Sequence, residues 1–155
     1  MASPKAKPPV IQDGPVVEVQ ILSLNDFHGN LEPPAGSSGR VGATNAGGAE
    51  FLATHIENLE QANRNTIVVA AGDLIGATPL LSAAFHDEPT IEAMNQIGLD
   101  LSSVGNHEFD EGATELLRMQ NGGCHPVDGC GDGTGFAGAD FQYLSANVVQ
   151  DSNGE

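Results

Sequence analysis

The sequence predicts an α/β fold with a mainly parallel sheet, and two observations lead to this prediction. Short apolar, β-branched runs alternate with stretches of helical periodicity, in the order β-α-β-α-β-α-β. Strands that alternate with helices usually form a parallel sheet covered by those helices. Polar residues follow three of the apolar runs directly, which is where open sheets of this kind collect their ligands.

The length and composition indicate one acidic domain. The chain has 155 residues, 39% of them hydrophobic, and a formal net charge of -16. We divide it into a Pro- and Lys-rich lead-in at residues 1–15, expected to be disordered, and a domain at residues 16–155. The acidity disfavours nucleic acid or an anionic membrane as a partner. No run reaches the roughly 18 apolar residues of a membrane span, and MASPKAKPPV lacks the apolar segment of a signal peptide.

The first half of the domain predicts two strands separated by a loop and a helix. VVEVQILSL, residues 16–24, is apolar and β-branched, as buried strands are. Residues 29–48 are rich in Gly, Ser and Pro and are expected to form a long loop. From Ala49 apolar residues recur at helical spacing. TIVVAAG, residues 66–72, predicts the second strand.

Two further helices and a strand are expected in the middle of the chain. A short helix is predicted at residues 79–85. Thr90 is expected to cap the next helix, and Gly98 to end it. LDLSSVG, residues 99–105, predicts the third strand.

The last part of the chain predicts a helix, a loop and a fourth strand. The helix at residues 113–120 is expected to turn Leu116, Leu117 and Met119 inward. A Gly-rich loop at residues 121–140 precedes the strand FQYLSANVV.

Cys124 and Cys130 lie in this Gly-rich loop, six positions apart. They lack the second cysteine pair or the histidines of a zinc knuckle. The spacing favours a short disulfide loop over two free thiols, and a disulfide indicates an extracytoplasmic protein.

Polar side chains that can bind metal follow each of the first three strands. Asp26 and His28 follow the first strand, Asp73 the second, and Asn106 and His107 the third. If these strands are parallel neighbours, about 4.8 Å apart, the side chains converge at one edge of the sheet.

Such convergence calls for cations, because the carboxylates of Asp26 and Asp73 would repel one another in a partly dry site. Oxygen and imidazole ligands suit divalent Mn, Zn or Fe. The Asp-x-His spacing of Asp26 and His28 places both side chains on one side of an extended segment. A carboxylate on the middle strand can bridge two ions, and two ions about 3.5–4 Å apart stabilise phosphoryl displacement. The pattern therefore predicts a binuclear metal site.

The motifs NDFHG, GDLIG and GNHEFD, in this order, resemble the first three motifs of the calcineurin-like metallophosphoesterases. GGAEFLATHIENL, GDLIGATPLLSAAF, EPTIEAMNQIGLD and VGNHEFDEG resemble, more narrowly, its secreted 5′-nucleotidase branch. The resemblance covers residues 19–112 and is looser over residues 121–155. It implies that the domain is the first half of a four-layer α/β/β/α sandwich.

The resemblance also implies a role for each strand-end residue. Asp26 and His28 would bind the first metal, Asp73 would bridge both metals, and Asn106 would bind the second metal and the substrate. His107 would stabilise the scissile phosphate or protonate the leaving oxygen.

Three other residues are assigned around this centre. Asp110 would orient and charge His107. Arg40, one of five Lys or Arg residues, is a candidate contact for the substrate phosphate. Glu108 could support the metal ligands from behind or lie at the surface, and the surface position is favoured.

The function implied is that of a metal-dependent phosphoric ester hydrolase, in which a metal-bound hydroxide releases phosphate from a nucleotide, as in nucleotide catabolism. A phosphodiesterase acting on cyclic nucleotides, nucleotide sugars or nucleic acid is the alternative within the same chemistry. The full-length enzyme would hold two divalent ions, Zn, Mn or similar. It is expected outside the cytoplasm: extracellular, periplasmic or at the cell surface.

The family's later histidine ligands, a lone His and a Gly-His-x-His segment, have no match here, since His125 lies in the context CHPVDGC. The resemblance thus implies that the chain is the N-terminal portion of a longer polypeptide, with the C-terminal part as its partner. Alone, this portion is expected to be inactive and to bind one metal or none.

Overall fold

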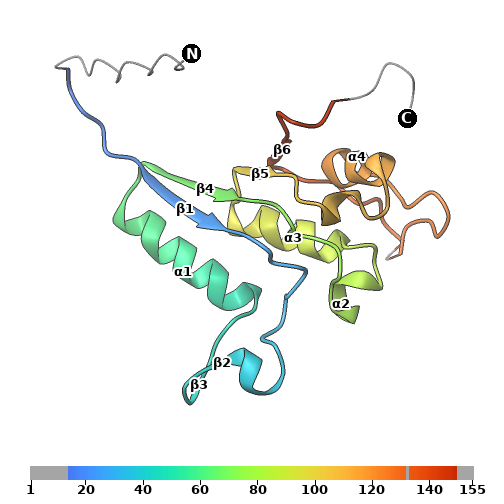
Figure 1. Cartoon of the computed structure of the whole chain (residues 1–155), viewed down its shortest axis with the longest axis horizontal. Helices are drawn as coiled ribbons and strands as arrows, with labels where there is room; N and C mark the ends of the chain where they lie inside the picture. The colour runs from blue at the N-terminus through green and yellow to red at the C-terminus, as the bar shows by residue number, and fades with distance from the viewer. Residues whose placement is uncertain (1–13, 132, 150–155) are drawn as a thin grey trace, which may run out of the picture.

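The central sheet has four strands, all parallel, in the order β1-β4-β5-β6 (Figure 1). The computed structural model describes residues 14–131 and 133–149, so most of the expected lead-in lies outside the described residues. The strands are β1 Gln20–Leu24, β4 Thr66–Ala70, β5 Leu101–Ser103 and β6 Gln142–Leu144. The predicted α/β class with a mainly parallel sheet is confirmed.

Helices connect these strands, and three of them supply side chains to the buried core. The helices are α1 Ala49–Ala62, α2 Leu80–Ala83, α3 Glu88–Ile97 and α4 Ala113–Asn121. Helices α1 and α3 lie side by side, on the same side of the sheet (Figure 1). Their inward side chains, among them Ile56, Ile91 and Met94, form one buried cluster with Val68 of β4.

The two faces of β1 differ in burial, as the period of two in a strand requires. Leu22 and Leu24 pack against the buried cluster. Ile21, which precedes Leu22 and points to the opposite face, is 66% exposed, and Leu144 of β6 is 51% exposed. In the described chain, helices therefore cover one face of the sheet, and apolar side chains on the other face remain exposed.

The strands are shorter than the sequence predicts. Strand β1 begins at Gln20, opposite Thr66 of β4, so residues 16–19 have no parallel neighbour and do not form a strand. The expected loop at residues 29–48 contains a 3-10 turn, Gly36–Gly39, and a two-stranded hairpin of β2 Arg40–Val41 and β3 Thr44–Asn45. The prediction of a long loop did not include this hairpin.

Two predictions about helices were also wrong. Helix α3 begins at Glu88, because His86 and Asp87 adopt left-handed backbone conformations just before it. Thr90 is therefore not a cap; it is buried in the first turn, with its hydroxyl 2.6 Å from that of Ser82. In α4, Leu117 is 61% exposed and Arg118 is buried in its place.

Arg118 tolerates burial because carboxylates surround its guanidinium group. Its Nη1 lies 2.5 Å from Glu88 Oε1 and its Nη2 lies 2.7 Å from Glu115 Oε1. Nη1 also donates to the carbonyl oxygen of Gly123. Arg118 thus ties α4 to α3 and to the start of the cysteine loop.

None of the helices in the described chain is long and apolar enough to cross a bilayer.

Substitution of Arg118 tests this buried network. We expect Arg118→Ala to lower the free energy of unfolding by about 3–5 kcal/mol, since Glu88 and Glu115 would lose their counter-ion inside the protein. The matched control is Arg64→Ala, at an exposed position, with a change below about 0.5 kcal/mol. Urea denaturation followed by circular dichroism measures both. Equal effects of the two substitutions would contradict the role of Arg118.

Candidate metal centre

The segments that follow β1 and β4 are joined by backbone hydrogen bonds at the edge of the sheet. The amide of Asp26 donates to Gly72 O (3.1 Å), and that of His28 to Asp73 O (3.0 Å). Asp26, His28 and Asp73 have φ angles of 51°, 46° and 51°, in the left-handed region that non-glycine residues rarely adopt. Three candidate ligands therefore share an uncommon backbone conformation, which costs of order 1–3 kcal/mol each and clusters at functional sites.

The segments after β4 and β5 approach each other where each carries a glycine. A Cβ atom on Gly72, whose φ is +98°, would lie 2.4 Å from Gly105 N. A Cβ atom on Gly105 would lie 2.1 Å from Asp73 Oδ1. Any side chain at either position would push the two segments apart, and Asp73 with them.

Glu108 joins the same two segments, and its predicted surface position was wrong. It is 2% exposed. Its carboxylate accepts hydrogen bonds from the amides of Asp73 (2.9 Å), Leu74 (2.8 Å) and Gly105 (2.5 Å). The spacing from Gly105 to Glu108 is that of a capping box, in which a Glu reaches back three residues to a free amide. That spacing is the sequence signal that could have identified Glu108.

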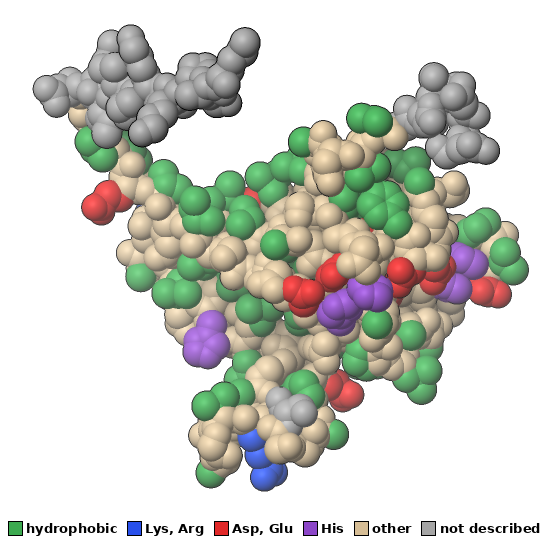
Figure 2. Space-filling model, viewed as in Figure 1, with side chains coloured by type: hydrophobic (Ala, Val, Ile, Leu, Met, Phe, Trp, Pro, Cys, Tyr) green, Lys and Arg blue, Asp and Glu red, His purple; other side chains and the backbone are tan. Residues whose placement is uncertain are grey.

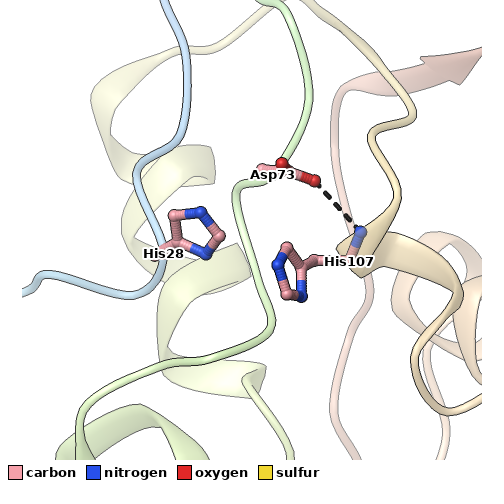
Figure 3. A group of neighbouring side chains, drawn as sticks. All are labelled: His28, Asp73 and His107. Carbon is pink, nitrogen blue, oxygen red and sulfur yellow. Dashed lines mark hydrogen bonds between the residues drawn. The ribbon is translucent and has the colours of Figure 1, made fainter.

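Three side chains converge beside these joined segments: His28, Asp73 and His107 (Figure 3). Their nearest donor atoms all lie within 4.8 Å of one another. The rings of His28 and His107 meet edge to face, with centroids 4.9 Å apart. Asp73 Oδ1 accepts a hydrogen bond of 3.0 Å from the amide of His107. Three strand ends thus supply one small volume, as the sequence pattern predicts.

A backbone carbonyl determines which ring nitrogen of His28 is free to bind a metal. The sequence analysis did not identify this contact. His28 Nδ1 lies 2.8 Å from Gly76 O and can only donate to it, which leaves Nε2 with a lone pair. A ligating histidine commonly donates its other N–H to a backbone carbonyl in this way.

The remaining predicted site residues lie at different distances from this cluster. Asp26 Oδ1 is 3.9 Å from His28 Nε2, and the Asp26 side chain is 57% exposed. Asn106 immediately precedes His107 and is exposed. Arg40 is in the β2–β3 hairpin, which projects away from the sheet (Figure 1), and its Nε donates to Asn45 Oδ1. No described contact joins Arg40 to the cluster.

His107 is paired with Asp110, as the resemblance implies. Its Nδ1 lies 2.6 Å from Asp110 Oδ2. This hydrogen bond raises the pKa of His107 above its ordinary value of 6.5. Desolvation acts in the opposite direction, and the negative charges of Asp110, Asp73 and Glu108 add smaller increases. Since Asp110 engages Nδ1, Nε2 is the nitrogen left for a substrate or a metal.

The charge balance of the cluster fits a divalent cation. The Arg residues of the described chain are Arg40, Arg64 and Arg118, and none is ion-paired with Asp26 or Asp73. Arg118 already pairs with Glu88 and Glu115. Imidazole and carboxylate donors at one point, without a resident Lys or Arg, suit Mn, Fe or Zn.

The fold and the cluster together define an α/β protein with a candidate metal centre at the carboxyl ends of its parallel strands. No family model matches the chain. An uncharacterized protein in the pqq-V 5′ region of Acinetobacter calcoaceticus is 48% identical over 145 residues, covering 84% of this chain and 70% of that protein.

Longer relatives match over a small part of their length. Endonuclease YhcR of Bacillus subtilis is 41% identical over 144 residues, covering 90% of this chain and 11% of YhcR. A snake venom 5′-nucleotidase of Gloydius brevicauda is 35% identical over 132 residues, covering 84% of this chain and 20% of the venom protein.

Solved structures of a nucleotidase and a phosphoesterase also match this chain. The NAD nucleotidase of Haemophilus influenzae superimposes with a TM-score of 0.67 at 27% identity, covering 89% of this chain and 22% of that one. The calcineurin-like phosphoesterase YfkN of Bacillus subtilis gives a TM-score of 0.58 at 30% identity, over 88% of this chain and 39% of that one. The chain belongs to the 5′-nucleotidase and calcineurin-like phosphoesterase family, which confirms the resemblance seen in the sequence.

Glu108 provides a test of how the centre is held. We expect Glu108→Gln to lower the free energy of unfolding by about 2 kcal/mol, because a neutral amide replaces a buried carboxylate that accepts three backbone hydrogen bonds. Chemical denaturation measures the change, and Glu92→Gln, at an exposed position of α3, is the matched control. Equal stability of the two variants would show that the Glu108 contacts contribute little.

The His107–Asp110 pair gives a prediction for the metal-free protein. We expect Asp110→Asn to lower the pKa of His107, as measured by NMR titration of its imidazole protons in chelator. Because the pKa is raised in the folded state, the pair stabilises the fold below about pH 6.5, and this contribution disappears as the pH rises through the raised value. An unchanged titration curve in Asp110→Asn would contradict the assignment.

Proposed function

We propose that this chain supplies strand-end residues of a metal-dependent phosphoester hydrolase whose substrates are nucleotides. The convergence of His28, Asp73 and His107 carries this proposal. Two of the relatives described above are 5′-nucleotidases or nucleotidases by name, which supports phosphate release from a nucleotide as the reaction.

The metal ligands proposed are Asp26 and His28 for a first ion, Asp73 between two ions, and Asn106 for a second. Zn or Mn fits these donors. A bound divalent ion would supply positive charge and would lower the pKa of a coordinated water toward about 7. The backbone holds Asp73 between the segments after β1 and β5, a position suited to the bridging role.

His107 and Asp110 are proposed to act on the substrate. Asp110 accepts the N–H of His107 Nδ1 and so keeps the ring oriented. The raised pKa of His107 keeps Nε2 protonated to a higher pH. A protonated Nε2 can neutralise charge on the phosphate and give its proton to the leaving oxygen. The proposal of Arg40 as a phosphate contact requires movement of the hairpin, since Arg40 has no described contact with the cluster.

A phosphodiesterase is the second candidate. It is favoured by the similarity to a protein named an endonuclease, which covers 90% of this chain. The net charge of -16 weighs against long nucleic acids as substrates. Monoester and diester substrates therefore belong in the same assay.

The extent of the relatives bears on what this chain does alone. The chain spans 70% of the Acinetobacter relative, but 11% of YhcR and 20% of the venom enzyme. We propose that turnover by the 155 residues alone is slow or absent, and that one ion binds at the strand ends. Matches to venom and cell wall proteins support a location outside the cytoplasm.

The test is hydrolysis of AMP and p-nitrophenyl phosphate, beside bis(p-nitrophenyl) phosphate, by this chain and by the full-length H. influenzae NAD nucleotidase as a positive control. With Mn²⁺ or Zn²⁺ we expect any turnover to favour monoesters and to fall by at least about 10³-fold in Asp73→Asn. His55→Gln, at an exposed position, should match the wild type.

Metal binding distinguishes a chain that holds the proposed metal centre but has no turnover from a chain that lacks this centre. Calorimetry of the same proteins should give one Zn²⁺ or Mn²⁺ that depends on Asp73, whether or not turnover is detected. Turnover that survives Asp73→Asn, or binding unaffected by it, would contradict the proposal. A preference for the diester would favour the phosphodiesterase.

A further inference from the structure

Two histidines outside the strand-end centre stack on each other beside the cysteine loop. The rings of His86 and His125 are nearly parallel, at 6°, with centroids 3.7 Å apart. A disulfide joins Cys124 to Cys130 and so encloses His125 and Asp128 in a short loop. Figure 2 shows histidine and acidic side chains in a row across this side of the molecule.

The spacing of the donor atoms is that of ligands around one ion. Asp128 Oδ2 lies 2.9 Å from His86 Nε2 and 3.4 Å from His125 Nδ1, and all three residues offer atoms within 4.8 Å of one another. Ligands about 2.0–2.1 Å from a tetrahedral zinc ion lie about 3.3 Å apart. The donor atoms therefore lie near the separations that one ion requires, and the main change needed is a reorientation of the two rings.

Carboxylates also lie at the other edge of the imidazole stack. Glu111 Oε2 is 3.9 Å from His86 Nδ1. Glu111, Glu115 and His125 offer donor atoms within 4.8 Å of one another. A histidine that binds metal through one nitrogen usually donates the other N–H to such a carboxylate.

The segments that carry these donors are held in place. His125 and Gly129 exchange backbone hydrogen bonds of 3.1 and 2.9 Å within the disulfide loop. His86 is fixed by a left-handed backbone, φ 50°, and by its neighbour Asp87, which accepts a 2.7 Å hydrogen bond from the Ser82 hydroxyl. The donors are therefore set on two restrained segments, which lowers the entropic cost of binding an ion.

The charge at this position is uncompensated in the described chain. Neither Glu111 nor Asp128 forms a described ion pair with Lys or Arg, and Arg118 is engaged by Glu88 and Glu115. Protonation of both stacked imidazoles would place two like charges face to face. A divalent ion relieves both problems, because it binds neutral imidazole and neutralises the carboxylate.

We propose that His86 Nε2, His125 Nδ1 and the Asp128 carboxylate form a second divalent-metal site, suited to Zn²⁺, with Glu111 orienting His86. The side chain of Asp128 is 64% exposed, so the fourth position faces water. A metal lies in the plane of each imidazole that it binds. The rings must therefore tilt out of their parallel stack, and the hydrogen bond from the Asp128 amide to His125 Nδ1 must open.

The experiment is a Zn²⁺ titration of the 155-residue chain, followed by NMR of the imidazole protons and by calorimetry. It is repeated in a His28→Gln/Asp73→Asn variant, which weakens the strand-end centre. There we expect one equivalent of Zn²⁺ to bind and to shift the resonances of His86 and His125. His86→Gln/His125→Gln should remove this equivalent, Glu111→Gln should weaken it by about tenfold, and His55→Gln is the matched control.

Unshifted His86 and His125 resonances in the wild type, or an equal zinc stoichiometry with and without His86→Gln/His125→Gln, would overturn the proposal. This second comparison needs only the wild-type background, so it decides the question even if the His28→Gln/Asp73→Asn variant fails to fold. Because this comparison changes only His86 and His125, its outcome is independent of metal binding at the strand ends.

Discussion

The buried carboxylate of Glu108 is the contact on which the strand-end cluster depends. It accepts hydrogen bonds from amides on both sides of the gap between the segments after β4 and β5. Those amides have no strand partner, because the sheet ends there, and a buried unpaired amide is costly. By satisfying them, Glu108 fixes the backbone at Asp73 and at Gly105, and His107 follows two residues after Gly105. The absence of side chains at Gly72 and Gly105 lets the segments come this close.

A second line of contacts positions His28 from the opposite side. The Ser82 hydroxyl donates to Asp87, Asp87 accepts from the Gly76 amide, and the Gly76 carbonyl accepts from His28. His28 therefore depends on the turn before α3, far from it in sequence. The same turn presents His86 toward the cysteine loop. One left-handed pair, His86 and Asp87, thus orients side chains toward two separate groups of candidate ligands.

The sequence was sufficient for the order of elements and for the convergence at the sheet edge. Alternating apolar runs imply neighbouring parallel strands, and parallel strands bring Asp26, Asp73 and His107 to one end regardless of side-chain detail. The predicted strands were too long because a strand can pair only where its neighbour is also extended. Strand β1, for example, starts at Gln20, which lies opposite the first residue of β4, Thr66. Glu108 and Arg118 were missed because charged residues are buried only with partners, and those partners come from other segments. The stacking of His86 on His125 joins residues 39 positions apart, a proximity no local pattern reveals.

The central claim is that His28 and Asp73 bind a common divalent ion at the carboxyl ends of β1 and β4. A crystal structure of this chain grown with Mn²⁺, with anomalous diffraction data, tests it most directly. We expect an anomalous peak within bonding distance of His28 Nε2 and an Asp73 carboxylate oxygen, about 2.0–2.3 Å from each. Ordered, separated His28 and Asp73 side chains with no peak between them, at a manganese concentration that saturates binding in solution, would contradict it.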